Sequence, residues 1–139
     1  MKTYETETDI AATPDVVWHV LTHVMPRTPA PFGIVRLEGT LEERARIKLW
    51  SQASPNRAFG LRVARFDAPH RMVWRGGLPL GLFTGVRTFT LTPAPGGARF
   101  SMREDFSGPL SAMIVATMPD LTPSFTTFAH TLKTKAEQV

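Results

Sequence analysis

Glu104 and Arg87 are the two residues whose types and spacing best suit chemistry inside a fold. Glu104 alternates with Met102 and Phe106, so in a strand its carboxylate lies on their apolar face. Arg87 has the phase of Phe89 on the preceding run, and a turn between the runs places the two charges opposite or diagonal. An unpaired carboxylate there is costly. We expect an internal salt bridge, a polar anchor for a ligand carbonyl or carboxylate, or an acid–base site.

The remaining chemistry-bearing residues form no convergent set. His19 and His23 have the i, i+4 spacing of a zinc-binding helix, but no third ligand is near in sequence, so an exposed pair is expected. His70 and His130 have no identifiable partner. The absence of cysteine excludes disulfides, thiolate metal sites and a cysteine nucleophile. There is no Gly-x-Ser-x-Gly elbow and no phosphate-binding glycine fingerprint, and we expect no metal and no cofactor.

Composition indicates one globular domain over residues 1–139. The chain is 42% hydrophobic and 20% charged, which is ordinary for such a domain. The net charge of +4 comes from arginines at alternate positions of strand-like runs, a pattern typical of a solvated sheet face and not of a nucleic-acid surface. No run approaches the roughly 18 apolar residues of a membrane span, and the N-terminus is not a signal peptide. A cytoplasmic monomer or homodimer is expected.

Periodicity predicts an antiparallel sheet followed by a long helix. A short helix is expected after the first strand, with Thr13 as N-cap and Pro14 at the first helical position. Residues 110–138 have helical period, and the prolines predict a break near Met118-Pro119. Period-two alternation predicts strands at 4–10, 34–38, 45–52, 59–66, 71–75, 86–92 and 98–107.

The segment Gly76–Gly85 interrupts this pattern with glycine, leucine and proline. It resembles a loop yet is unusually apolar. Two interpretations fit it: an entrance loop that moves over a ligand, or an apolar hairpin tip packed on the helix.

These elements predict an α+β domain in which the terminal helix covers the apolar face of the sheet. If the sheet is curved, helix and sheet separate in the middle and leave a gap for an apolar ligand. Met113 and Met118, beside the expected helix break, are the predicted gate residues. With Glu104 and Arg87, the predicted ligand-binding residues are Trp50, Trp74, Phe83, Phe89, Met102, Phe106, Met113, Met118 and Phe125.

Several strings resemble the START-related superfamily, also described as polyketide cyclase/dehydrase and lipid transport proteins. They are Ile10–Trp18, Phe66–Trp74, Phe89–Pro93 with Gly96-Gly97, and Glu104–Gly108. The resemblance implies the helix-grip fold, a curved antiparallel sheet of about six to seven strands wrapped around a long C-terminal helix. Many relatives follow the first helix with an aromatic-x-x-Trp-Asn-Pro string where this chain has Met25–Phe32, which predicts a different cavity entrance.

The function implied is a binding or carrier protein for a small, largely apolar molecule such as a lipid, an aromatic or a polyketide-like compound. One alternative is a cyclase or dehydratase that uses Glu104 with Arg87. Another is an interaction module resembling chaperone activators, which requires an exposed apolar patch. The scarcity of convergent catalytic groups favours binding over catalysis.

Overall fold

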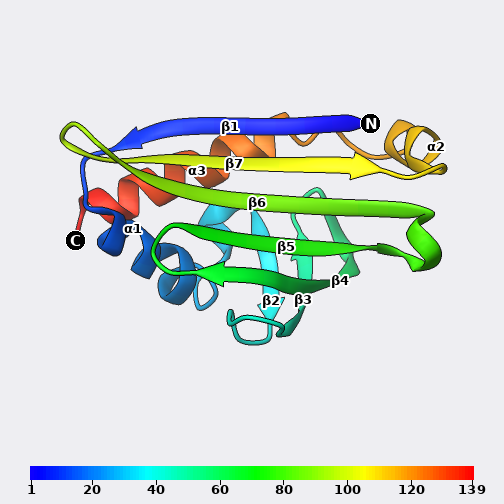
Figure 1. The fold of residues 1–139 in the computed structure, drawn as a ribbon, viewed down its shortest axis with the longest axis horizontal. Coiled ribbons are helices and arrows are strands. Elements are labelled where there is room, and N and C mark those ends of the chain that lie inside the picture. Colours follow the sequence, from blue (N-terminus) through cyan, green and yellow to red (C-terminus); the bar gives the residue numbers. More distant parts are fainter.

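The computed structural model describes residues 1–139 as one curved antiparallel sheet with a long helix laid across it (Figure 1). The strand order in the sheet is β1-β7-β6-β5-β4-β3-β2. The elements in chain order are β1 (Lys2–Ile10), α1 (Pro14–His19), the π-helical turn η1 (Val20–Val24), the 3-10 turn η2 (Ala30–Phe32), β2 (Ile34–Glu38), β3 (Arg46–Ser51), β4 (Ser54–Asp67), β5 (Arg71–Leu78), the 3-10 turn η3 (Pro79–Gly81), β6 (Phe83–Ala94), β7 (Gly97–Ser107), α2 (Ser111–Ala116) and α3 (Thr122–Glu137).

This arrangement confirms the predicted α+β helix-grip fold, including the short helix after β1. The hydroxyl of Thr13 accepts a hydrogen bond from the Val16 amide at 3.3 Å, which is the N-cap expected from the sequence. Beyond α1 the backbone widens into the π-helical turn η1. There the Thr22 hydroxyl donates to the Trp18 carbonyl at 2.8 Å, competing with the helical ladder for that acceptor. None of the helices has the length and apolarity that crossing a membrane requires.

The loop interpretation of Gly76–Gly85 is wrong. The β5–β6 ladder continues through Gly77 opposite Thr84, and only η3 turns the chain. Gly77 has φ +141°, and a Cβ there would lie 2.0 Å from the Phe83 carbonyl oxygen, so only glycine fits. Backbone hydrogen bonds between β5 and β6 hold this hairpin together. Its side chains do not alternate between polar and apolar, so the sequence pattern did not predict these strand residues. The tip of the hairpin packs on the turn before α2, where the Leu110 amide donates to the Leu82 carbonyl at 3.0 Å. It does not pack on α3.

β4 also begins earlier than predicted, at Ser54 and not at residue 59. The early residues of β4 are mostly exposed on both faces, so they carry no alternation of polar and apolar side chains. Their strand conformation comes from the pairing of Ser54 with Ser51 across a tight connection.

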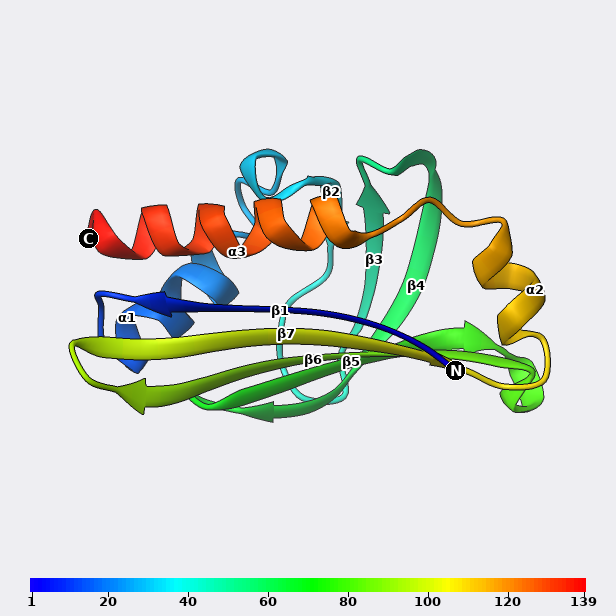
Figure 2. The ribbon, with the colours of Figure 1, turned by 90° about the horizontal axis from the view of Figure 1, so that it is seen from above.

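The predicted break in the C-terminal helix is confirmed, because α2 ends at Ala116 and α3 begins at Thr122. Figure 2 shows α3 running beside β1 while β3 and β4 rise toward it, so the sheet curves around the helix. α2 lies past the break, at the opposite end of the molecule from α1 (Figure 1).

Phe128 fills the middle of the interface between α3 and the sheet. Its ring centre lies 5.4 Å from that of Phe32, 5.8 Å from that of Phe89 and 6.2 Å from that of Phe100. All four side chains are almost completely buried. Aromatic rings at these separations gain pair energy beyond the burial of apolar area. The contact between α3 and the sheet is therefore centred on a fully packed cluster of aromatic side chains.

Phe128→Ala is expected to lower the free energy of unfolding by about 3–5 kcal/mol, because a cavity replaces the buried ring. Urea unfolding measures the change. His130→Ala on the exposed side of α3 is the control and should cost no more than about 0.5 kcal/mol. Equal effects of the two substitutions would contradict this account of the core.

The C-terminal end of α3 is fastened to the end of β1 by Glu137. Its Oε2 accepts the Ala11 amide at 2.8 Å and the Lys133 ammonium at 2.8 Å. The backbone hydrogen bond from Ala11, and then Lys133, hold the pKa of Glu137 below its ordinary value. A lowered folded-state pKa stabilises the fold above the unfolded-state pKa of about 4.3, and this contribution is lost as pH falls through the folded-state value.

Glu137→Gln is therefore expected to lower the Tm at neutral pH, and the difference from the parent protein should shrink as pH falls below about 4.3. Thermal unfolding across this pH range measures it. Glu42→Gln, at an exposed carboxylate with no side-chain partner, serves as the control. A Tm difference that stays constant with pH would rule out the role given to the Glu137 charge.

Candidate functional site

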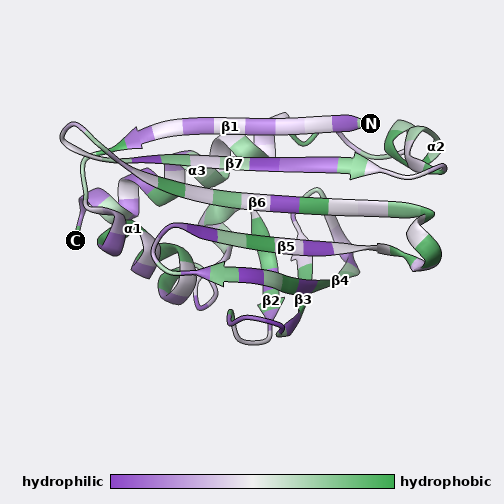
Figure 3. Cartoon of the chain, in the orientation of Figure 1, coloured by the Kyte–Doolittle hydropathy of each residue, from purple (hydrophilic) through white to green (hydrophobic).

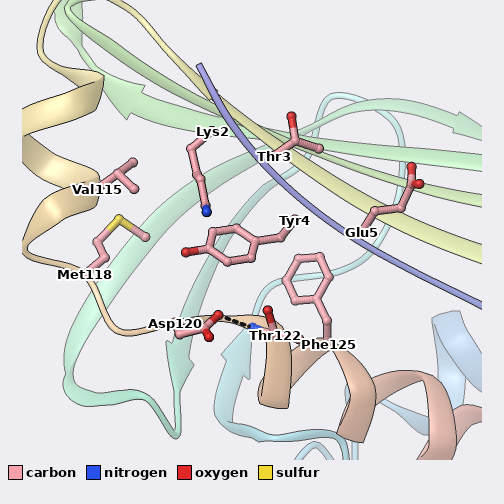
Figure 4. Close-up of a pocket in the computed structure, with 9 residues that line it drawn as sticks. All are labelled: Lys2, Thr3, Tyr4, Glu5, Val115, Met118, Asp120, Thr122 and Phe125. Carbon is pink, nitrogen blue, oxygen red and sulfur yellow. Dashed lines mark hydrogen bonds between the residues drawn. The ribbon is translucent and has the colours of Figure 1, made fainter.

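A cavity of about 550 Å³ lies between the start of β1, the α2–α3 break and the first turns of α3 (Figure 4). The first residues of the chain meet the start of α3 here because β1, an edge strand of the sheet, packs along α3. In Figure 4 the side chains of Lys2, Tyr4, Met118, Asp120 and Phe125 converge, while Thr3 and Glu5 point to the other side of β1. The full lining is Lys2, Thr3, Tyr4, Glu5, Val115, Met118, Asp120, Thr122 and Phe125.

Aromatic rings form one wall of the cavity. The Tyr4 ring lies 6.0 Å from Phe125 and 6.3 Å from Phe106, centre to centre. Phe106 in turn stacks on Phe83 at 5.6 Å with an interplanar angle of 9°. Gly85 faces Phe106 across the strands, and a Cβ there would come within 3.1 Å of the ring, so the missing side chain leaves room for it.

Polar side chains make up most of the rest of the lining. The Lys2 ammonium lies 5.1 Å from the centre of the Tyr4 ring, a cation–π distance. Asp120 accepts the Thr122 amide at 2.9 Å, and this hydrogen bond, followed by that of the Thr122 side chain and with a smaller effect of Lys2, lowers the Asp120 pKa. The lining thus carries one cation, Lys2, and two carboxylates, Glu5 and Asp120, beside the aromatic wall.

The Arg87–Glu104 ion pair lies behind this wall. The two residues are directly opposite on β6 and β7, and Glu104 is also opposite Tyr4 on β1. Glu104 Oε1 accepts both Arg87 Nη2 at 2.7 Å and Nε at 3.2 Å. The side chains are only 18% and 12% exposed. The Arg87 guanidinium carbon lies 5.0 Å from the centre of the Phe125 ring, which also borders the cavity.

The pair leaves hydrogen-bonding capacity unused. Both donors of Arg87 go to one oxygen, so neither Glu104 Oε2 nor Arg87 Nη1 has a hydrogen-bond partner in the protein. Trp74 lies opposite Arg87 on β5, and its buried indole N–H also has no acceptor. Buried donors without partners are rare and cost about 1–3 kcal/mol each. Of these atoms only the Trp74 N–H is fully buried without a partner, whereas Glu104 Oε2 and Arg87 Nη1 remain accessible to solvent or to a ligand.

The structure distributes the other predicted residues over three places. Met118 and Phe125 line the cavity, and Phe106 and Phe83 back its wall. Trp74, Phe89 and Met102 are packed inside the core. Two predicted residues lie away from the cavity: Trp50, which stacks under Arg36 at 5.4 Å, and Met113, which is 62% exposed on α2.

Besides Thr3 and Glu5, whose side chains point to the other side of β1, sequence reasoning missed five lining residues: Lys2, Tyr4, Val115, Asp120 and Thr122. Tyr4 had a usable signal, because it falls on the inward phase of the first strand and is the only tyrosine. The other four are brought together by the folding of α2 back over β1, which no local pattern reports.

The histidine pair is exposed on α1 and η1, as expected. The His19 and His23 rings stack at 4.9 Å with an interplanar angle of 14°. No group of three or more histidine, aspartate or glutamate side chains gathers as metal ligands.

A family model described as polyketide cyclase/dehydrase and lipid transport matches residues 1–137. Among solved structures, protein MLL2253 of Mesorhizobium loti aligns with a TM-score of 0.75 at 17% identity, over 99% of this chain and 98% of that one. A Rhodobacter sphaeroides protein gives 0.67 at 22% identity over 99% and 93%. The di-domain ARO/CYC protein StfQ of the steffimycin biosynthetic pathway gives 0.74 at 12% identity, over 98% of this chain and 51% of StfQ. The curated proteins include no match. At these identities the solved structures establish the fold alone.

The ion pair makes a stability prediction of its own. Arg87→Met leaves a mostly buried carboxylate without its partner and is expected to lower the free energy of unfolding by about 3 kcal/mol. Adding Glu104→Leu should restore much of that loss. The exposed pair of Arg99 and Asp9 is the control, and its double-mutant cycle should give about 0–1 kcal/mol. Urea unfolding of both cycles checks this, and additive effects at Arg87 and Glu104 would contradict it.

Proposed function

The chain belongs to the polyketide cyclase/dehydrase and lipid transport family, and from this premise we propose that it binds a small, largely apolar ligand in the cavity between β1 and the α2–α3 break. The single observation that carries the proposal is the cavity itself, which combines an aromatic wall with charged and polar lining residues. Its volume of about 550 Å³ falls within the range of pockets that hold small molecules.

The shape of the cavity supports an amphiphilic ligand. The apolar part of the molecule lies against Tyr4, Phe125 and Met118, where water is poorly accommodated. A polar end remains at the mouth, within reach of the Lys2 ammonium. Lipids, aromatic acids and polyketide-like compounds all have this division between an apolar body and an oxygen-bearing end.

Arg87 and Glu104 provide a second, deeper polar contact. Phe125 borders both the cavity and the Arg87 guanidinium, so a ligand lying against its ring approaches the pair. The free Nη1 donates to a carbonyl, and the free Oε2 accepts from a hydroxyl. Such a ligand would satisfy groups that the protein alone leaves unpaired. We assign the pair to anchoring and orientation of the ligand.

Binding is favoured over catalysis because the site lacks an assembled set of reacting groups. Acid–base and nucleophilic chemistry need a base beside the group that it activates. Asp120 and Glu5 line the cavity without a nucleophile or acid set against them, and the nearest polar neighbour of Glu104, behind the wall, is an always-protonated arginine. The specific observation that favours a cyclase or dehydratase instead is the unpartnered Oε2 of Glu104.

A matched pair of substitutions on α2 tests the binding proposal. Val115 lines the cavity and Met113 does not, so Val115→Phe should fill the cavity while Met113→Phe leaves it open. With decanoate and 2-naphthol as probes, calorimetric titration should give at least about tenfold weaker binding to Val115→Phe, equivalent to about 1.4 kcal/mol. The Met113→Phe protein should bind like the parent. Denaturing mass spectrometry of the purified protein would then search for a co-purified ligand.

Two outcomes count against the proposal: no probe binding by the parent protein, or the same affinity in both variants. Glu104→Gln separates binding from catalysis. If a ligand identified in this way is turned over by the parent protein and only bound by Glu104→Gln, the site is an enzyme site and the carrier assignment is wrong.

A further inference from the structure

Three arginines lie side by side across the convex face of the sheet. Arg46 on β3 is directly opposite Arg62 on β4, and Arg62 is directly opposite Arg75 on β5. Their neighbours along each strand, Ile47, Val63 and Trp74, are buried on the concave side, so the arginines point outward and are exposed. Like charges directly opposite on paired strands destabilise a sheet.

The rest of this face avoids that cost by pairing arginines with carboxylates. Arg99 forms ion pairs with Glu7 and Asp9 of β1, and Arg103 with Glu5 and Asp105. None of the ion pairs in the structure includes Arg46, Arg62 or Arg75. The row is therefore the part of the face where positive charge accumulates with nothing in the chain to neutralise it.

A cavity of about 300 Å³ opens at this row. Arg62 and Arg75 line it, together with Leu78, Thr84 and three glycines of the β5–β6 hairpin. No carboxylate borders it, and the only charged groups are the two guanidinium forks. The glycines leave backbone uncovered by side chains, and Thr84 adds a hydroxyl. A concave site that offers hydrogen-bond donors and positive charge suits an oxyanion.

We propose that this cavity binds a phosphate group, with Arg62 and Arg75 as its ligands and Arg46 adding charge from the next strand. The planar guanidinium presents two parallel N–H donors that match phosphate oxygens. Two such forks carry a charge of +2, which a phosphate monoester of about −1.5 to −2 at neutral pH neutralises. The volume leaves space for a small organic group beyond the phosphate.

Two sources could supply that phosphate. One is a soluble phosphomonoester. The other is a phospholipid headgroup, because Leu78 lines the cavity and Leu80, at the hairpin tip, is 97% exposed. Figure 3 shows hydrophobic colouring at this tip and on α2, at one end of the molecule. The site lies on the opposite face of the sheet from the apolar cavity, so it does not depend on the function proposed above.

Thermal unfolding in phosphate and in chloride at equal ionic strength tests the site, with saturable glycerol 3-phosphate binding measured by titration. We expect phosphate to raise the Tm of the parent protein above its value in chloride. Arg62→Gln and Arg75→Gln should remove this difference and weaken glycerol 3-phosphate binding at least about tenfold. Without phosphate, both variants should be at least as stable as the parent, because the repulsion is relieved.

Arg71→Gln is the matched control, since Arg71 is on the same strand and face, four residues or about 13 Å from Arg75. It should leave the phosphate response intact. Arg62→Lys and Arg75→Lys keep the net charge but lose the fork, and each should still weaken binding. Two results would overturn the proposal: the same Tm of the parent protein in phosphate and in chloride, or a loss of the phosphate response in Arg71→Gln as large as in Arg75→Gln. Either would indicate that diffuse positive charge, and not a specific site, attracts phosphate.

Vesicles distinguish the two sources. Cosedimentation with phosphatidylcholine vesicles containing phosphatidic acid, lost in Arg75→Gln and in Leu80→Ser, identifies a lipid headgroup. Glycerol 3-phosphate binding without cosedimentation identifies a soluble ester. Either result supports the phosphate site, and the absence of both refutes it. Val115→Phe should leave the phosphate response, the glycerol 3-phosphate affinity and the vesicle binding unchanged. A negative result for the phosphate site can therefore be distinguished from a negative result for ligand binding in the apolar cavity.

Discussion

The packing of α3 on the concave face of the sheet is the constraint on which the rest of the structure depends. A one-sided sheet has to bury its apolar face, and in this chain one helix supplies most of the cover. Phe128 meets Phe32, Phe89 and Phe100 at the centre of that contact and closes it completely. Because the centre is filled, the 550 Å³ cavity lies where the helix begins, beside the break that separates it from α2.

The position of the cavity explains why the ion pair matters. Arg87 and Glu104 occupy the transverse row of the sheet just behind Tyr4, where the core changes from solid aromatic packing to open space. Deeper in the core the pair would carry a large desolvation cost, and farther out it would be screened by water. In its actual position it is mostly buried yet retains free hydrogen-bonding atoms, which suits recognition of a ligand oxygen.

The two faces of the sheet differ in whether their arginines are paired with carboxylates. On the concave face a single arginine is matched by a single glutamate. On the convex face the carboxylates of β1 neutralise the arginines of β7, but no acidic strand borders β3, β4 and β5. The acid in register with the row, Asp105 on β7, is separated from Arg75 by Val86 of β6 and is already paired with Arg103, so an outside anion can serve as counterion for the row.

By itself the sequence determined what local periodicity and steric rules can specify. Alternation placed the strands, Thr13 and Pro14 placed the start of α1, and the prolines placed the helix break, since each depends on residues within a few positions. It also placed Arg87 opposite or diagonal to Glu104, because a short hairpin transmits register from one strand to the next, and the structure shows them directly opposite. For Gly76–Gly85 the sequence left a loop and a hairpin tip as alternatives and did not show that β5 and β6 extend into it, because backbone pairing and not side-chain pattern holds these strands together.

Only the tertiary structure decided which residues share a surface. The cavity joins Lys2 and Tyr4 to Asp120 and Phe125 across nearly the whole chain, and the arginine row joins three strands through the registers of two strand pairs, each of which also contains an irregularity elsewhere along its length. Such contacts depend on the curvature of the sheet and on where a helix folds back, which are properties of the packed whole. A strand pattern says that Arg62 faces solvent, and only the sheet shows that Arg46 and Arg75 stand on either side of it.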